Sequence, residues 1–61
     1  MTKEDLAKLS VGTIVKLDGE EGEIVLAGQT VHIMWPESNR TNIIDTNSKS
    51  WVEFIGWLEA E

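Results

Sequence analysis

The sequence predicts a mostly β fold, a small five-stranded barrel preceded by a short N-terminal helix. Three observations support this prediction. Apolar and polar residues alternate along several short runs, turn-forming residues separate these runs, and the chain has only 61 residues. Five short strands in so small a chain favour a strongly bent barrel, because bending hides sheet edges that two or three flat strands would expose.

The N-terminal helix is expected at about residues 3 to 9. Thr2 carries a side chain suited to an N-cap, and acidic residues follow in the first turn, where the helix dipole favours negative charge. Leu6 and Leu9 share one face of this helix. Because one or two turns are not stable alone, these two leucines must dock onto a larger body.

Three strands are expected in the first half of the chain, at residues 13–17, 23–26 and 31–35. The third has the clearest alternation, with Val31, Ile33 and Trp35 expected to face the core. His32 alternates with them and should point outward. Pro36 ends this strand, since proline cannot donate to a β ladder.

Two further strands are expected in the second half. Residues 41–45 follow a polar connection of hairpin length, and residues 51–55 form the fifth strand, closed by Gly56. The predicted organisation is one domain over residues 1–61, with a helical segment at 1–10, the barrel at 11–56 and a tail at 57–61.

Composition excludes several classes of protein. Five Lys and Arg stand against eleven Asp and Glu, giving a net charge of −6, so direct binding to a nucleic-acid backbone is not expected. The chain has no Cys, which excludes a disulfide and a cysteine zinc site. No apolar run is long enough for a transmembrane span or a signal peptide, which predicts a soluble cytoplasmic protein without membrane contact.

Glycines and strand ends form a pattern over most of the chain. A Gly opens the first strand, a Gly-containing turn follows, and a later strand ends in Trp before a polar hairpin; the matching ranges are 11–25, 31–35 and 41–45. This pattern resembles the SH3-like barrel of the KOW and Tudor-like type. Stand-alone barrels this short resemble small accessory proteins of bacteria and phages, and a phage origin would imply the host cytoplasm.

Acidic residues cluster around the first turn, where Asp18, Glu20, Glu21 and Glu23 fall within six positions. KOW segments that bind nucleic acid carry basic residues here, so the resemblance does not extend to that use. Contact with basic side chains of a partner is the functional interpretation, and a solvated turn is the alternative. The spacing does not match a calcium loop, so we expect no metal.

Aromatic residues are the second candidate group: Trp35, Trp51, Phe54 and Trp57. Three interpretations are open, namely core packing, contact with a partner, and a cage for a methylated cation of the kind that Tudor-like relatives form. Trp57 is the best contact candidate because it lies with Leu58 beyond the last predicted strand. An exposed Trp-Leu pair would suit a binding hot spot, and the alternative is that it folds back over the open end of the barrel.

Arg40 and Lys49 are a candidate anion contact, because they lie in two polar connections expected at one end of the barrel. No second His or Cys accompanies His32 to complete a transition-metal site. No nucleophile, acid and base pair or phosphate-binding loop is evident, so we expect neither catalysis nor a cofactor.

Together these observations predict a non-enzymatic protein-interaction module, an acidic accessory protein that binds a partner with a basic or apolar surface, or itself as a homo-oligomer. The predicted contact residues are Trp57, Leu58, Asp18, Glu20, Glu21 and Glu23. Two alternatives remain open. One is a KOW-type nucleic-acid-associated factor that uses Arg40 and Lys49, whose binding would weaken steeply with salt. The other is a phage-type acidic protein that occupies a basic surface of a host nucleic-acid enzyme.

Overall fold

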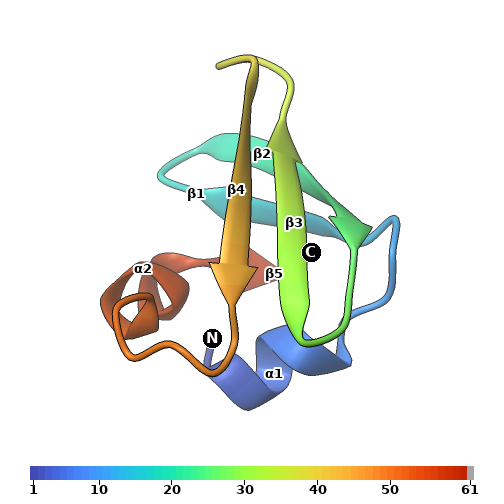
Figure 1. Ribbon diagram of the computed structural model, residues 1–61. Coiled ribbons are helices and arrows are strands. Elements are labelled where there is room, and N and C mark those ends of the chain that lie inside the picture. Colours follow the sequence, from blue (N-terminus) through green and yellow to red (C-terminus); the bar gives the residue numbers. More distant parts are fainter. Residues whose placement is uncertain (61) are drawn as a thin grey trace.

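A computed structural model describes residues 1–60 and confirms a mostly β fold, an antiparallel five-stranded sheet with two short helices (Figure 1). The elements are α1 (Lys3–Lys8), β1 (Ile14–Leu17), β2 (Glu20–Leu26), β3 (Thr30–Trp35), β4 (Arg40–Asp45), α2 (Val52–Trp57) and β5 (Glu59–Ala60). None of the described helices has the length and apolar character needed to cross a membrane.

The strands follow the order β4-β3-β2-β1-β5, and every neighbouring pair is antiparallel. Over the described residues the sheet is open, with β4 at one edge and β5 at the other, so the closed barrel expected from the sequence is not observed. Both helices lie at the end of the sheet where β3 begins and β4 ends (Figure 1). There they cover apolar side chains of the sheet that would otherwise be exposed to solvent.

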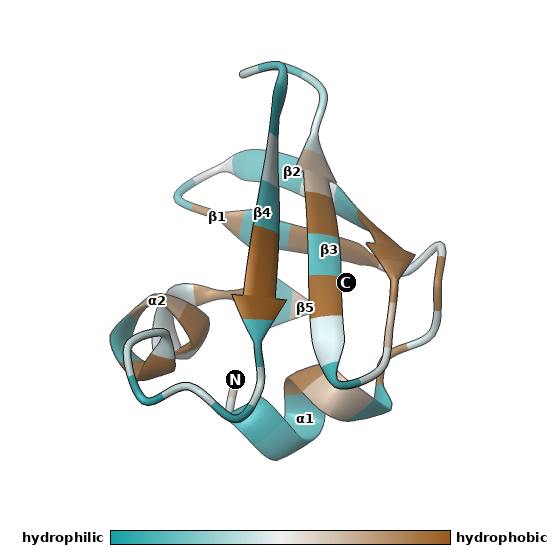
Figure 2. Cartoon of the chain, in the orientation of Figure 1, coloured by the Kyte–Doolittle hydropathy of each residue, from teal (hydrophilic) through white to brown (hydrophobic). Residues whose placement is uncertain are grey.

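The core consists of side chains from both helices and from four strands. Its members are Leu6, Val15, Ile24, Val31, Ile33, Trp35, Ile44, Ile55 and Leu58. The predicted alternation of β3 is confirmed, because Val31, Ile33 and Trp35 are buried while His32 is half-buried and Met34 is exposed. Figure 2 shows a hydrophilic band between hydrophobic bands along this strand. Burial of alternate residues fixes the register of this strand.

Helix α1 confirms the prediction of a capped N-terminal helix. The Thr2 hydroxyl accepts a bond from the Asp5 N–H, and the Asp5 carboxylate accepts one from the Thr2 N–H, both at 3.2 Å. This reciprocal capping box satisfies two N–H groups that the helix itself leaves without partners. Leu6 anchors the helix in the core.

The capping box makes the stability of the protein depend on pH in the acidic range. The Thr2 backbone N–H, helped by the Thr2 side chain, lowers the pKa of Asp5 below its ordinary value of 3.8. The carboxylate therefore stabilises the fold above that ordinary value, and its contribution disappears as the pH falls through the lowered pKa of the folded state. We expect Asp5→Asn to flatten this part of the stability profile, measured by urea unfolding between about pH 2 and pH 6. An unchanged pH slope in the variant would contradict the assignment.

The fifth strand predicted at residues 51–55 is wrong, because this segment begins helix α2 (Val52–Trp57). Its β-branched and aromatic composition suggests a strand, but its apolar residues follow another period. Trp51, Phe54, Ile55 and Leu58 lie at positions i, i+3, i+4 and i+7, which is the spacing of one helix face. Ile55 and Leu58 are buried, and Trp51 and Phe54 pack against the core at this face.

The predicted tail at 57–61 is also wrong for its described part. Residues Glu59–Ala60 form β5, which pairs with β1 through Val15 opposite Ala60 and Lys16 opposite Glu59. Glu61, the last residue of the predicted tail, lies outside the described residues. The chain end thus adds the strand that residues 51–55 were expected to supply.

Candidate functional site

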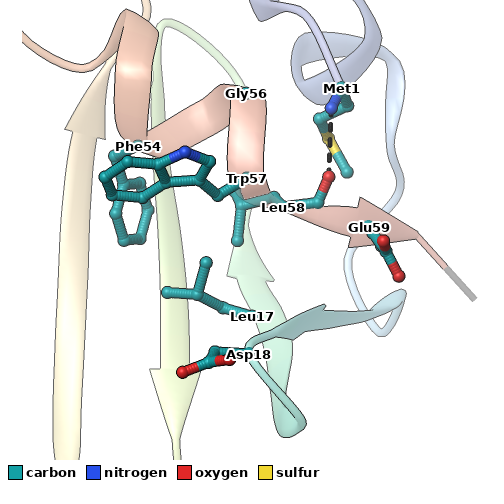
Figure 3. Close-up of a pocket in the computed structure, with 8 residues that line it drawn as sticks. All are labelled: Met1, Leu17, Asp18, Phe54, Gly56, Trp57, Leu58 and Glu59. Carbon is teal, nitrogen blue, oxygen red and sulfur yellow. Dashed lines mark hydrogen bonds between the residues drawn. The ribbon is translucent and has the colours of Figure 1, made fainter.

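A hollow of about 810 Å³ opens where the end of β1, helix α2 and the start of β5 meet (Figure 3). This volume falls within the range of natural ligand sites. We call it the Trp57 hollow, and its lining residues are Met1, Leu17, Asp18, Phe54, Gly56, Trp57, Leu58 and Glu59. It therefore brings together three of the residues predicted to contact a partner, namely Asp18, Trp57 and Leu58.

Trp57 and Leu58 lie next to each other in the chain but in different surroundings. Trp57 is the last residue of α2 and is 62% exposed, whereas Leu58 is 1% exposed and belongs to the core. The backbone leaves the helix at Leu58, whose φ of −72° and ψ of 142° are extended. The predicted exposed Trp-Leu pair is thus half correct, because Leu58 faces inward as an anchor and Trp57 alone offers a free apolar surface.

The walls of the hollow are apolar and come from two elements. Leu17 at the end of β1 and Phe54 of α2 are half-buried and pack against the core. Figure 3 shows the Trp57 indole near Phe54 on the side of α2, and Leu17 on the side of β1. Because Leu17 and Phe54 pack against the core, the apolar walls of the hollow are held in place.

The rim of the hollow is acidic. Asp18 and Glu59 are exposed carboxylates on it, and no Lys, Arg or His side chain is among the residues that line it. The positively charged Met1 amino group lies at the hollow too and donates to the backbone oxygens of Leu58 at 3.0 Å and Ile55 at 3.4 Å, so two carboxylates accompany one cation at this site. An aromatic surface beside carboxylates attracts cationic groups, through both charge and the ring quadrupole.

A tight turn places Asp18 on this rim. Asp18 has φ 51° and Gly19 has φ 86°, and they are the two residues between β1 and β2. Positive φ at both central residues is typical of the type I′ turn, whose twist matches that of the strands it joins. The turn expected between the first two strands is confirmed at Asp18-Gly19, but it does not extend to Glu21 and Gly22, which lie in β2.

The remaining members of the predicted acidic cluster do not line the hollow. Glu20, Glu21 and Glu23 belong to β2, which starts earlier than the predicted residue 23, so successive side chains point to opposite faces. Glu20 accepts a bond from the Ser38 hydroxyl at 2.6 Å. Glu21 lies opposite Lys16 in the β1–β2 pair. The alternation of β2 therefore divides a cluster that is continuous in the sequence.

Arg40 and Lys49 are not brought together as a pair. Arg40 is the first residue of β4, while Lys49 follows the last residue, Asp45, in the segment before α2. The whole of β4, about 17 Å long for five residue steps, lies between them. The predicted common anion contact at one end of the fold is therefore not formed.

The aromatic residues divide between packing and exposure. Trp35 is buried in the core, where its Nε1 donates to the Asn42 side-chain oxygen. Trp51 and Phe54 form an edge-to-face pair with ring centroids 5.4 Å apart, and both pack against the core. Trp57 is the aromatic residue with a large free surface among residues 1–60.

Sequence reasoning missed four residues of the hollow, Met1, Leu17, Gly56 and Glu59, and it named Phe54 only as a member of the aromatic candidate group. The helical spacing of residues 51, 54, 55 and 58 was a signal for Phe54, but no local pattern indicates that β5 returns to β1. Within the described part of the chain, no group of three or more His, Cys, Asp or Glu is placed to hold a metal ion. No family model, curated protein or solved structure matches this sequence or fold.

Proposed function

We propose that this protein is a non-enzymatic interaction module that binds a protein partner through the Trp57 hollow. The observation that carries the proposal is Trp57 itself, a 62% exposed indole at the edge of a hollow whose apolar walls pack against the core. Tryptophan is strongly enriched at binding hot spots, because a partner that covers it removes a large apolar surface from water.

The order of strands supports an SH3-like arrangement as the framework of this module. Strands β1 to β4 form a meander, a short helix follows β4, and β5 returns to pair with β1. In this framework the hollow lies between the β1–β2 turn and the helix that precedes β5. Fold alone does not define function, so the partner is argued from the chemistry of the hollow.

The partner that fits this chemistry presents a basic side chain next to an apolar one. The Asp18 and Glu59 carboxylates favour Lys or Arg, and the ring of Trp57 can carry either an apolar side chain or the cation itself. The net charge of −6 adds long-range attraction for a basic surface. A short segment of a protein partner with alternating basic and apolar residues meets both requirements.

Selection from a displayed library of random peptides tests the proposal. We expect enrichment of Lys or Arg beside apolar residues, and we expect Trp57→Ala to weaken binding of the selected peptide about 30-fold or more, as for a hot-spot residue of about 2 kcal/mol. The matched control is Val52→Ala, a 55% exposed residue of the same helix that does not line the hollow. Equal affinity of the Trp57→Ala and Val52→Ala proteins would refute the proposal.

The charge of the rim gives a separate prediction. Asp18→Asn removes the carboxylate but keeps a residue that tolerates the positive φ of the turn. We expect affinity for the selected peptide to fall about three- to tenfold and its dependence on salt to become shallower, mainly through slower association. Glu21→Gln removes the same charge outside the hollow and should change neither quantity as much. Isothermal titration at two salt concentrations measures both effects.

A further inference from the structure

Strand β4 leaves one of its two edges unpaired. It bonds to β3 over six consecutive residue pairs, from Arg40 opposite Trp35 to Asp45 opposite Thr30, and no strand within residues 1–60 lies on its other side. The ladder has no register shift along these six pairs. A straight and regular edge of this kind is a template for another strand.

The backbone groups on this open edge can be identified from the ladder. The Thr46 N–H donates to the Gln29 oxygen at 3.1 Å, in the same register as the β3–β4 pairs. Because bonded and non-bonded pairs alternate in an antiparallel ladder, Asn42 and Ile44 direct their N–H and C=O toward β3. Thr41 and Ile43 then direct theirs toward the open edge. The oxygen of Asp45, the next residue on that edge, already accepts from the Ser48 N–H at 3.0 Å.

The two edges of the sheet differ in their protection against such pairing. Strand β5 has two residues, one of which is the charged Glu59. Strand β4 has six, with no Pro, Gly, Lys or bulge, and its charged residues Arg40 and Asp45 lie at its ends. Ile43, in the unprotected middle, is 57% exposed. Proteins that remain monomeric usually place a charge, a proline or a bulge at such a position.

We propose that this edge is an interface between two copies of the chain, formed by antiparallel pairing of β4 with β4 of the second copy. In the register that places Asn42 opposite Asn42 of the second copy, Thr41 lies opposite Ile43 and both copies contribute equally. All the ladder bonds across the two-fold axis then come from the N–H and C=O groups of Thr41 and Ile43, which are the groups that β3 leaves unpaired.

The charges of β4 favour a second copy of the chain as the partner and favour antiparallel pairing. Arg40 begins the strand and Asp45 ends it, so antiparallel pairing brings oppositely charged strand ends together, whereas parallel pairing would bring like-charged ends together. The strand has no net charge, although the whole chain carries −6. This edge is therefore where two copies meet with little of the repulsion that the carboxylates of the remaining surface impose.

The outer face beside this edge gives the dimer additional apolar contact. Ile43 lies opposite His32, and His32 lies opposite Leu26, so a row of two exposed apolar residues with the half-buried His32 between them crosses three strands. Pairing at β4 places Ile43 of each copy beside Thr41 of the other and joins the two rows across the axis. The interface is small, which places the affinity in the micromolar to millimolar range.

Amide hydrogen exchange on the intact protein, followed by NMR at about 10 µM and about 1 mM, tests the proposal together with sedimentation equilibrium. We expect the mass to rise toward that of a dimer and exchange at Thr41 and Ile43 to slow at least about tenfold at the higher concentration. Exchange at Asn42 and Ile44 should be slow at both protein concentrations, because hydrogen bonds to β3 already protect those amides. A monomer throughout, or a dimer in which Thr41 and Ile43 exchange equally fast at both concentrations, would overturn the proposal.

A pair of variants provides an independent test. Ile43→Lys places a charge at the middle of the edge, and Val52→Lys places the same charge at a 55% exposed residue of α2. We expect Ile43→Lys to remain monomeric at about 1 mM and Val52→Lys to dimerise like the parent chain, with both variants keeping the unfolding midpoint of the monomeric parent. Because both changes reduce the net charge equally, equal dimerisation of the two variants would overturn the proposal.

Discussion

Leu58→Ala is expected to remove about 2 to 5 kcal/mol from the free energy of unfolding, because Leu58 is 1% exposed and its loss leaves a cavity in the core. A chain of this length has a total stability of about 3 to 9 kcal/mol, so this single change brings the protein close to unfolding. Leu58 also joins α2 to β5, so the edge strand β5 loses its buried anchor with it. Urea unfolding followed by far-ultraviolet circular dichroism measures the effect.

Two controls show whether the loss of stability comes from the burial of Leu58 or from the Leu→Ala change itself. Leu26→Ala removes the same atoms from an exposed residue and should change stability by less than about 0.5 kcal/mol. Leu58→Met keeps most of the buried volume and should cost less than about 1.5 kcal/mol. Should Leu58→Ala unfold at the same urea concentration as Leu26→Ala, the inward position of Leu58 and the pairing of β5 would both be wrong.

The part of the fold that could be predicted from the sequence is the part that local patterns determine. The capping box of α1, the Asp-Gly turn and the alternation along β3 each depend on residues that are close in the chain. The physical constraints there are strict, because only a few residues suit an N-cap or a positive φ, and one buried sheet face fixes every second side chain. The open edge at β4 is not visible in such patterns.

The second half of the fold shows where local composition fails. Residues 51–55 contain the β-branched and aromatic types that favour strands, yet the segment forms the start of α2, because a helix buries Ile55 and packs Phe54 and the N-cap residue Trp51 against the core. Tertiary burial therefore outweighs intrinsic preference. Strand β5 has only two residues and forms through its pairing with β1. Two residues are too few to show the alternation of apolar and polar side chains that indicates a strand.

Single residues of the candidate site could be predicted from the sequence, but their arrangement could not. Trp57 and Asp18 are recognisable as an aromatic residue after a predicted element and a carboxylate in a turn. Their meeting in one hollow depends on the return of β5 to β1, which is a long-range contact. The same return turns Leu58 inward. Charge clusters in sequence are poor guides where a strand carries them, since alternation places neighbouring carboxylates on opposite faces.

Gly22 of β2 is required by a close approach of side chains, and not by its backbone conformation. It lies opposite Val15 of β1, and the indole of Trp35 covers it from β3. A methyl group at Gly22 would lie 2.7 Å and 2.8 Å from the ring carbons Cε3 and Cζ3 of Trp35, and 2.9 Å from Cγ2 of Ile33. Trp35 cannot easily withdraw, because it is buried and its Nε1 donates to Asn42. The absence of a side chain at Gly22 is therefore what allows the largest core residue to fit.

Gly22→Ala is accordingly expected to lower the free energy of unfolding by about 1 to 3 kcal/mol, as overpacking of a well-filled core does. The control is Gly28→Ala, where an added methyl group meets nothing within 4 Å and stability should stay within about 0.5 kcal/mol of the parent or rise. The double variant Gly22→Ala with Trp35→Phe removes ring atoms from the clash, so its loss should be smaller than the sum of the two single losses. Additive losses in urea unfolding would show that Trp35 does not lie over Gly22, and the packing of β2 on β3 would need another explanation.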